Sequence, residues 1–120
     1  MKQGIGQSMD MTAAPELLVC TGCATPAAAR RLIAAASEAA PELSARPAAC
    51  LGVCTAPATL ALQQPGRATL IFSGVRPEHG TDLGSTARLW LDTPGGWFED
   101  ARPCGALRFL LRARIPAHRG

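Results

Sequence analysis

The chain has 120 residues and a mass of 12.5 kDa, which fits one domain and excludes a multidomain assembly. Hydrophobic residues make up 48% and charged residues 18%, so the chain can fold around a core and is not a disordered polyelectrolyte. The net charge of +3 is too small to indicate a nucleic-acid-binding protein. Because aromatic residues are only 4%, the core must be built mainly from small and aliphatic side chains, and such a domain benefits from a metal or a cross-link.

The ends of the chain differ in composition from its middle. We interpret residues 1–14 as a flexible N-terminal leader, 15–116 as the folded domain and 117–120 as a C-terminal tail. No apolar run reaches transmembrane length, and the start lacks the pattern of a signal peptide. Five cysteines without an export signal argue against a disulfide scaffold, because thiols in a reducing cytoplasm are more often ligands or catalytic groups. We therefore expect a cytoplasmic protein.

Local patterns predict four strands and two helices. In chain order they are a strand over 16–19, a helix over 27–40, strands over 43–48, 58–62 and 68–72, and a helix over 77–92. Thr25 and Pro26 are an N-cap and a first-turn proline for the first helix. Pro65 and Gly66 suit the central positions of a hairpin turn. Pro47 confines the second strand to a sheet edge.

This order of elements predicts the fold class. A right-handed βαβ unit followed by a hairpin and a helix is an α/β arrangement with a four-stranded mixed sheet, which is the minimal thioredoxin-like fold. The C-terminal stretch 101–120 has five arginines and no acidic residue. These arginines suggest a docking face for an acidic partner, or alternatively a solvated helix face with a fraying tail. They are Arg102, Arg108, Arg112, Arg114 and Arg119.

Four cysteines form two pairs that each follow a predicted strand. Cys20 and Cys23 form the motif CTGC after the first strand, and Cys50 and Cys54 form the motif CLGVC after the second. Because the strands of a βαβ unit are parallel, both pairs are expected at the same carboxyl edge, where ligand sites of open α/β sheets lie. Neighbouring strands are about 4.8 Å apart, so the two loops can close around one ion or a small cluster.

Thiolates in this number suit Zn²⁺ or an iron–sulfur cluster. Gly22 and Gly52 lie inside the two pairs, where the missing side chain lets backbone N–H groups approach sulfur. The alternative is that the cysteines are small buried hydrophobes, which explains a single cysteine better than two pairs at equivalent strand ends.

The second half of the chain resembles thioredoxin-like [2Fe-2S] ferredoxins and a related subunit of respiratory complex I. The matching features, in order, are Cys50-Leu51-Gly52-Val53-Cys54, Ala56-Pro57, a strand, Pro65-Gly66, another strand and Pro77-Glu78. The resemblance implies one [2Fe-2S] cluster on the four paired cysteines and electron transfer to or from a redox partner protein. From the charge and the lack of a long apolar run we expect neither a nucleic acid nor a membrane as partner, and a homodimer stays open.

A closer resemblance, over 17–116, is to small bacterial proteins described as predicted metal-binding proteins of unknown function. They share the CxxC start, the CLxxC loop, the Pro-Gly hairpin and an ending like Ala113-Arg114-Ile115-Pro116. Two departures leave the identity of the metal open. The ferredoxins separate their first two cysteines by a longer stretch than Cys20 and Cys23, and many members of the closer family carry a further cysteine where this chain has Ala58.

Two other functions compete with the ferredoxin. The same four cysteines can hold a structural zinc ion in an interaction protein. A CxxC motif between a strand and a helix is also the position of a thiol–disulfide oxidoreductase dithiol, with Cys20 as the nucleophile near the start of the helix. That function leaves Cys50 and Cys54 without a role. The sequence does not decide whether the protein is an enzyme, and it favours an electron carrier or a metal-binding protein.

The remaining candidate residues carry weaker signals. Cys104 has no place in a site saturated by the other cysteines, so we expect it not to be a ligand. His79 and His118 are far from the cysteine pairs in sequence and are expected to be solvated. Trp90 and Trp97 are expected in the core or as a lid rather than as a stacking platform. No catalytic Ser/His/Asp arrangement, carboxylate pair or phosphate-binding loop is visible, so we expect no catalytic residues of those kinds.

Overall fold

The computed structural model describes residues 14–21, 25–48 and 58–117 of the chain. Its strands are β2 (Glu16–Cys20), β3 (Ser44–Ala48), β4 (Leu60–Gln64), β5 (Arg67–Phe72) and β6 (Leu111–Ile115). Its α-helices are α1 (Pro26–Ala39) and α2 (Gly80–Asp92), and shorter 3₁₀ segments are η2 (Pro77–His79), η3 (Pro94–Gly96) and η4 (Arg102–Phe109).

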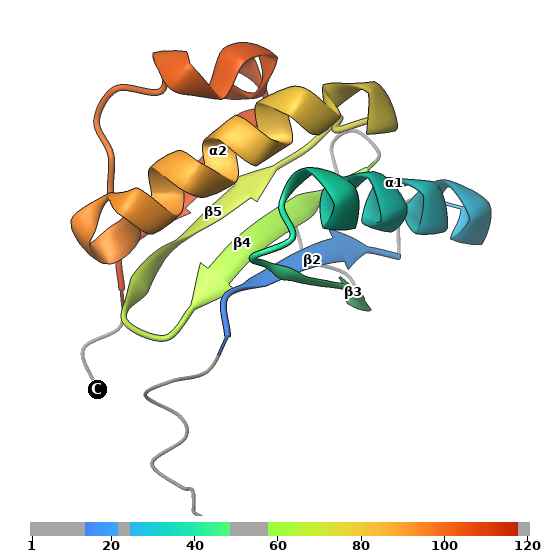
Figure 1. Cartoon of the computed structure of the whole chain (residues 1–120), viewed down its shortest axis with the longest axis horizontal. Helices are drawn as coiled ribbons and strands as arrows, with labels where there is room; N and C mark the ends of the chain where they lie inside the picture. Colours follow the sequence, from blue (N-terminus) through green and yellow to red (C-terminus); the bar gives the residue numbers. More distant parts are fainter. Residues whose placement is uncertain (1–13, 22–24, 49–57, 118–120) are drawn as a thin grey trace, which may run out of the picture.

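The strands form one five-stranded mixed sheet in the order β3-β2-β4-β5-β6. β2 and β3 are parallel, and the pairs β2–β4, β4–β5 and β5–β6 are antiparallel. Both α-helices lie over the same face of the sheet, with α1 above β2 and β3 and α2 farther along toward β5 (Figure 1). The α/β class and the mixed sheet predicted from the sequence are therefore confirmed.

The number of strands was wrong in the sequence analysis, which expected four. Residues 111–115 form a fifth strand, β6, antiparallel to β5, with Leu70 opposite Arg114 and Ile71 opposite Ala113. This segment alternates arginines with apolar residues, a period of two that fits a strand. From the arginines we expected a charged helical face or a tail in this segment. The strand forms instead because the edge of β5 offers backbone hydrogen bonds that only another strand can use.

The helix boundaries follow the signals in the sequence. Thr25 caps α1, because its side-chain Oγ1 accepts a hydrogen bond from the backbone N–H of Ala28 at 3.1 Å. Pro26 occupies the first turn, where its missing N–H costs no helical hydrogen bond. The second predicted helix is divided into η2 and α2, which together span the predicted 77–92. No helix among the described residues combines the length and apolar character needed to cross a membrane.

Leucine, alanine and a few aromatic side chains build the core between the sheet and the helices. Leu17 and Val19 of β2 point to this side and are fully buried, while Leu18 between them belongs to a smaller cluster on the opposite face with Ala61 and Ile71. The period of two in β2 thus divides it between both faces of the sheet. β2 is therefore an interior strand buried on both faces, and it ends at the first predicted cysteine, Cys20.

β3 lies at an edge of the sheet, as Pro47 predicted. Pro47 has no N–H to donate to a neighbouring strand, so an outermost position costs it nothing. The hairpin between β4 and β5 is confirmed as well. Gly66 has a φ of 82°, the left-handed conformation that a turn with glycine at this position requires.

We expect the Glu16 carboxylate to make folding stability depend on pH. It accepts hydrogen bonds from Arg46 Nε at 2.9 Å and from Gln63 Nε2 at 3.1 Å, which join β2 to both of its neighbours. The hydrogen bond from Arg46, followed by that from Gln63, lowers the pKa of Glu16 below its ordinary value of 4.5. A carboxyl group with a lowered folded pKa contributes stability above its unfolded pKa and loses it as pH falls through the folded pKa.

Glu16→Gln should therefore cost below about 1 kcal/mol of unfolding free energy at neutral pH and should remove part of the loss of stability below about pH 4.5. Urea unfolding of both proteins between neutral and acidic pH measures the difference. Glu42→Gln, in the exposed turn after α1, is the matched control for the loss of one carboxyl group without the hydrogen bonds between strands. Parallel stability curves for Glu16→Gln and the unsubstituted chain at every pH would contradict the prediction.

Candidate metal centre at the carboxyl edge of the sheet

Cys20 is the last residue of β2 and is fully buried. Its backbone N–H donates to the carbonyl oxygen of Thr59, just before β4, at 2.8 Å. This hydrogen bond fixes the end of β2 against the segment that leads into β4. Burial of this kind suits a ligand thiol, because the surrounding apolar atoms keep water from the sulfur. Cys20 is the only member of the two predicted cysteine pairs that lies within the described residues.

The end of β3 lies next to the end of β2. Ala48, the last residue of β3, is paired in register with Cys20. Thr21 strengthens this contact, because both its backbone N–H and its side-chain hydroxyl donate to the carbonyl oxygen of Ala48, at 3.0 and 2.9 Å. The sequence predicted that the two strands would end side by side at one edge, and this part of the prediction is confirmed.

A third chain segment meets the same edge. Ala58 and Val75 exchange backbone hydrogen bonds of 3.5 and 3.1 Å, which ties the stretch before β4 to the stretch after β5. Since β4 runs antiparallel to β2, the start of β4 lies at the same edge as the end of β2. Three described residues lie nearest in sequence to the other predicted ligands: Thr21 before Cys23, Ala48 before Cys50 and Ala58 after Cys54. All three are anchored at one edge of the sheet.

The other predicted ligands, Cys23, Cys50 and Cys54, lie outside the described residues. Within the described part of the chain, no group of three or more His, Cys, Asp or Glu residues could hold a metal ion. Because only one of the four predicted ligands belongs to that part, the ligand set stays a prediction.

Cys104 lies in η4, a segment that packs against α2, and it is buried. Burial raises the pKa of its thiol, a hydrogen bond with Thr86 partly opposes that rise, and the charges of Asp82 and Asp100 add to it. A neutral, enclosed thiol of this kind suits packing better than ligation. That Cys104 is not a ligand remains a prediction.

A comparison with protein families decides the relationship of the chain. The family described as "Protein of unknown function (DUF1636)" matches residues 17–117, which is most of the chain. The chain belongs to this family. No curated protein and no solved structure matches the chain.

In this DUF1636 protein the two tryptophans and His79 form hydrogen bonds within the fold. Trp90 is fully buried and its indole Nε1–H donates to the carbonyl oxygen of Ala68 at 2.8 Å, as a core residue would. Trp97 is 38% exposed, and its Nε1–H donates to Glu99 Oε2 at 3.0 Å. His79 accepts a hydrogen bond at Nδ1 from the backbone N–H of Arg76 at 2.9 Å, so it caps a local turn. His118 lies outside the described residues.

Three of the C-terminal arginines have polar partners within the fold, and the docking face stays a prediction. Arg102 pairs with Asp100 at 2.8 Å. Arg112 donates to Ser73 Oγ at 2.7 Å and Arg114 donates to the carbonyl oxygen of Phe98 at 2.7 Å. Arg119 lies outside the described residues. Arg108 has its guanidinium carbon 4.6 Å from the ring centre of the exposed Phe109, and β6 aligns Arg112 and Arg114 with groups in neighbouring segments.

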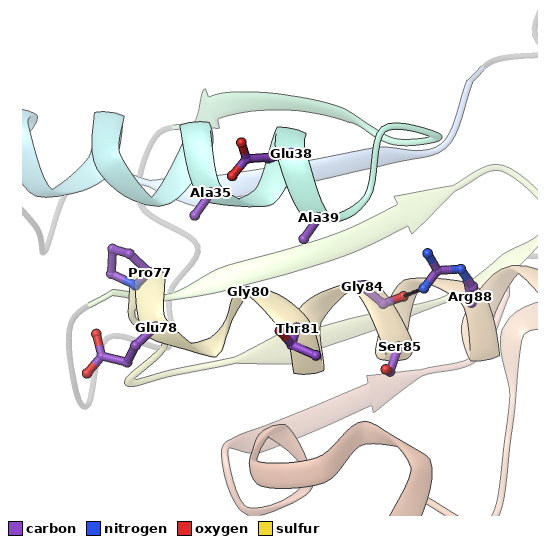
Figure 2. A pocket seen from close by; sticks show the side chains of 10 residues that line it. All are labelled: Ala35, Glu38, Ala39, Pro77, Glu78, Gly80, Thr81, Gly84, Ser85 and Arg88. Carbon is purple, nitrogen blue, oxygen red and sulfur yellow. Dashed lines mark hydrogen bonds between the residues drawn. The ribbon is translucent and has the colours of Figure 1, made fainter.

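The two helices border a surface groove of about 440 Å³ (Figure 2). Figure 2 shows α1 along one side of it and η2 and α2 along the other. Gly84 is required here, because a Cβ atom at this position would lie 2.8 Å from the carbonyl oxygen of Ala39 in α1. The groove holds two carboxylates and an arginine. Its lining residues are Ala35, Glu38, Ala39, Pro77, Glu78, Gly80, Thr81, Gly84, Ser85 and Arg88.

This groove has no cysteine or histidine in its lining and lies along the helices rather than at the carboxyl edge. Arg88 uses its NH1 group to donate to the carbonyl oxygen of Gly84 at 3.2 Å, within its own helix. The groove therefore does not have the chemistry of the predicted metal centre. The sequence does not predict this groove, because its lining residues come from two helices that meet only in the tertiary structure.

Proposed function

We propose that this DUF1636 protein is a thioredoxin-like [2Fe-2S] protein of the cytoplasm that transfers electrons to or from a redox partner protein. The proposed ligands are Cys20, Cys23, Cys50 and Cys54. When bound, such a cluster supplies one-electron transfer at a potential that its protein environment adjusts. The chain would bind the cluster, orient it toward a partner and limit the access of water.

The topology supports the thioredoxin-like assignment. β2, α1 and β3 form a parallel βαβ unit, and β4 and β5 form the hairpin that follows it on the other side of β2. The order β3-β2-β4-β5 is the four-stranded sheet expected for that fold, and β6 extends it by one strand. A helix, α2, follows β5 and covers the same face as α1 (Figure 1).

One observation carries the proposal: Cys20 ends β2 directly opposite Ala48, the residue that ends β3. Cys50 follows Ala48 by two positions in the sequence. Two residues of chain span at most about 7 Å, so Cys50 is within reach of the edge whatever its conformation. The same limit applies to Cys23 after Thr21, and Cys54 is four positions, at most about 14 Å, from Ala58.

The burial of Cys20 also bears on the oxidoreductase alternative. A nucleophilic thiolate must approach a substrate disulfide directly, so it needs an accessible sulfur. Cys20 has no exposed surface, which suits an enclosed ligand and disfavours an attacking thiolate. The zinc alternative uses the same four ligands and is separated from the cluster by the identity of the metal.

Metal analysis and a visible spectrum of anaerobically purified protein test the proposal. A brown protein with iron and acid-labile sulfide in equal amounts, about two of each per chain, is the expected result. A colourless protein with one zinc ion per chain would replace the cluster by a structural zinc site. Metal-free protein that catalyses disulfide reduction would overturn the proposal in favour of the oxidoreductase.

A further inference from the structure

A second concavity, of about 350 Å³, lies between the first turns of α1 and the outer strand β3. Its walls are almost entirely apolar and come from segments far apart in the sequence. Its lining residues are Thr21, Pro26, Ala29, Arg30, Ile33 and Pro47. Cavities of this size with apolar walls and one or two polar groups are typical of small-molecule sites.

The shape of this apolar pocket depends on rigid residues. Ala29, which lines it, is buried at 3% exposure, and Ile33, one turn later on the same helix, is partly buried. Pro26 and Pro47 contribute walls from α1 and β3, and a proline ring has almost no conformational freedom to lose when a ligand binds. A preformed pocket of this kind binds with less loss of entropy than one that must be ordered first.

The charge of the pocket indicates the kind of ligand. Among the described lining residues Arg30 is the one charged side chain, it is exposed, and none of the described carboxylates forms an ion pair with it. The first turn of α1 has no acidic residue, so nothing there repels an anion. A guanidinium on the rim of an apolar cavity matches a carboxylate on an apolar body.

We propose that this pocket binds a small monocarboxylate with an aliphatic or aromatic body, the body lying between Pro26, Ile33 and Pro47 and the carboxylate pairing with Arg30. Cys20, the proposed metal ligand that lies within the described part of the chain, is not among the lining residues, and the proposal rests on Arg30 and the apolar walls rather than on the metal. Thr21 connects the two sites, because it follows Cys20 and also lines the pocket.

Isothermal titration calorimetry with phenylacetate and with hexanoate, on the full chain as purified, tests this proposal. Saturable binding of one ligand per chain is expected, with perturbed amide resonances in NMR spectra concentrated around Ala29 and Ile33. The neutral analogues phenylacetamide and hexanamide should bind at least about tenfold more weakly, because the charged hydrogen bond to Arg30 is lost.

Two neighbouring arginines provide a matched pair of variants. Arg30→Gln should weaken phenylacetate binding about tenfold, whereas Arg31→Gln, also exposed but absent from the lining, should change it less than about twofold. Both positions are on the surface, so neither variant is expected to unfold the chain. Equal effects of the two substitutions, equal binding of the acid and its amide, or an absence of saturable binding would each overturn the proposal. The metal content of every variant, measured separately, keeps this outcome distinct from failure of the proposed metal centre.

Discussion

Cys50→Ser or Cys54→Ser should abolish metal binding and lower the free energy of unfolding by more than about 4 kcal/mol. Losses of this size are typical of substitutions that remove a bound metal. Each replacement removes one thiolate of the proposed set of four. In the proposed centre it would also break the link through the metal between the segment before Ala58 and the end of β2, so the free energy of metal binding would no longer contribute to folding. Iron, sulfide and zinc analysis of purified variants, combined with urea unfolding, measures both effects.

Cys104→Ser is the matched control for these variants. Cys104 is buried in η4 against α2, so serine there should cost about 1–2 kcal/mol for burying a hydroxyl and should leave the metal content and the visible spectrum unchanged. Loss of metal from this variant alone would show that the ligand set is wrong, with Cys104 in place of one member of the first pair. Full metal retention by Cys50→Ser and Cys54→Ser would equally contradict the proposed centre.

Trp90→Ala should destabilise the domain by about 3–5 kcal/mol, because Trp90 is the largest fully buried side chain described. The substitution leaves a cavity between α2 and the sheet and removes the partner of the Ala68 carbonyl. It also removes the ring beneath Arg67, whose guanidinium carbon lies 5.5 Å from the Trp90 ring centre. Arg67 NH1 donates to the carbonyl oxygens of Trp90, Leu91 and Thr93 at 2.9, 3.2 and 3.1 Å, so the end of α2 should loosen as well.

Urea unfolding followed by circular dichroism measures this effect. Trp90→Phe keeps a ring but loses the indole hydrogen bond and should cost about 1–3 kcal/mol, which provides a result even where the alanine variant does not fold. Trp97→Ala is the control on the surface. Trp97 is 38% exposed and its ring lies 4.9 Å from the guanidinium carbon of Arg114, so its removal should cost about 1 kcal/mol or less. Comparable losses for Trp90→Ala and Trp97→Ala would contradict this account of the core.

Local signals predicted most of the fold. The Thr25 cap and Pro26 defined the start of α1, and the Pro65-Gly66 turn defined the β4–β5 hairpin. These signals act within a few residues, so they can be read before any tertiary contact is known. β6 was missed for the opposite reason. Its hydrogen-bond partner, β5, is some forty positions earlier in the chain. No residue pattern near 111–115 indicates that β5 has an edge to which a strand can add.

The candidate sites divide in the same way. The spacing of the cysteines and the parallel strands of the βαβ unit were sufficient to predict one common edge, and the register of Cys20 with Ala48 agrees with that prediction. The pocket beside it could not be predicted, because Pro47 and Arg30 come from a strand and a helix whose distance depends on packing. The same holds for the environment of Arg112 and Arg114, because β6 places them within hydrogen-bonding distance of Ser73 and of the Phe98 carbonyl oxygen.

The sequence by itself thus determined the α/β class, the order of the central strands and the common edge at which β2 and β3 end, since these follow from local propensity, capping and the direction of a βαβ connection. Only the tertiary structure decided the fifth strand, the apolar pocket at the start of α1 and the burial of Cys20 and Cys104. Each of these depends on contacts between segments distant in the chain, and the free energy of such contacts comes from packing and hydrogen bonds that no local pattern specifies.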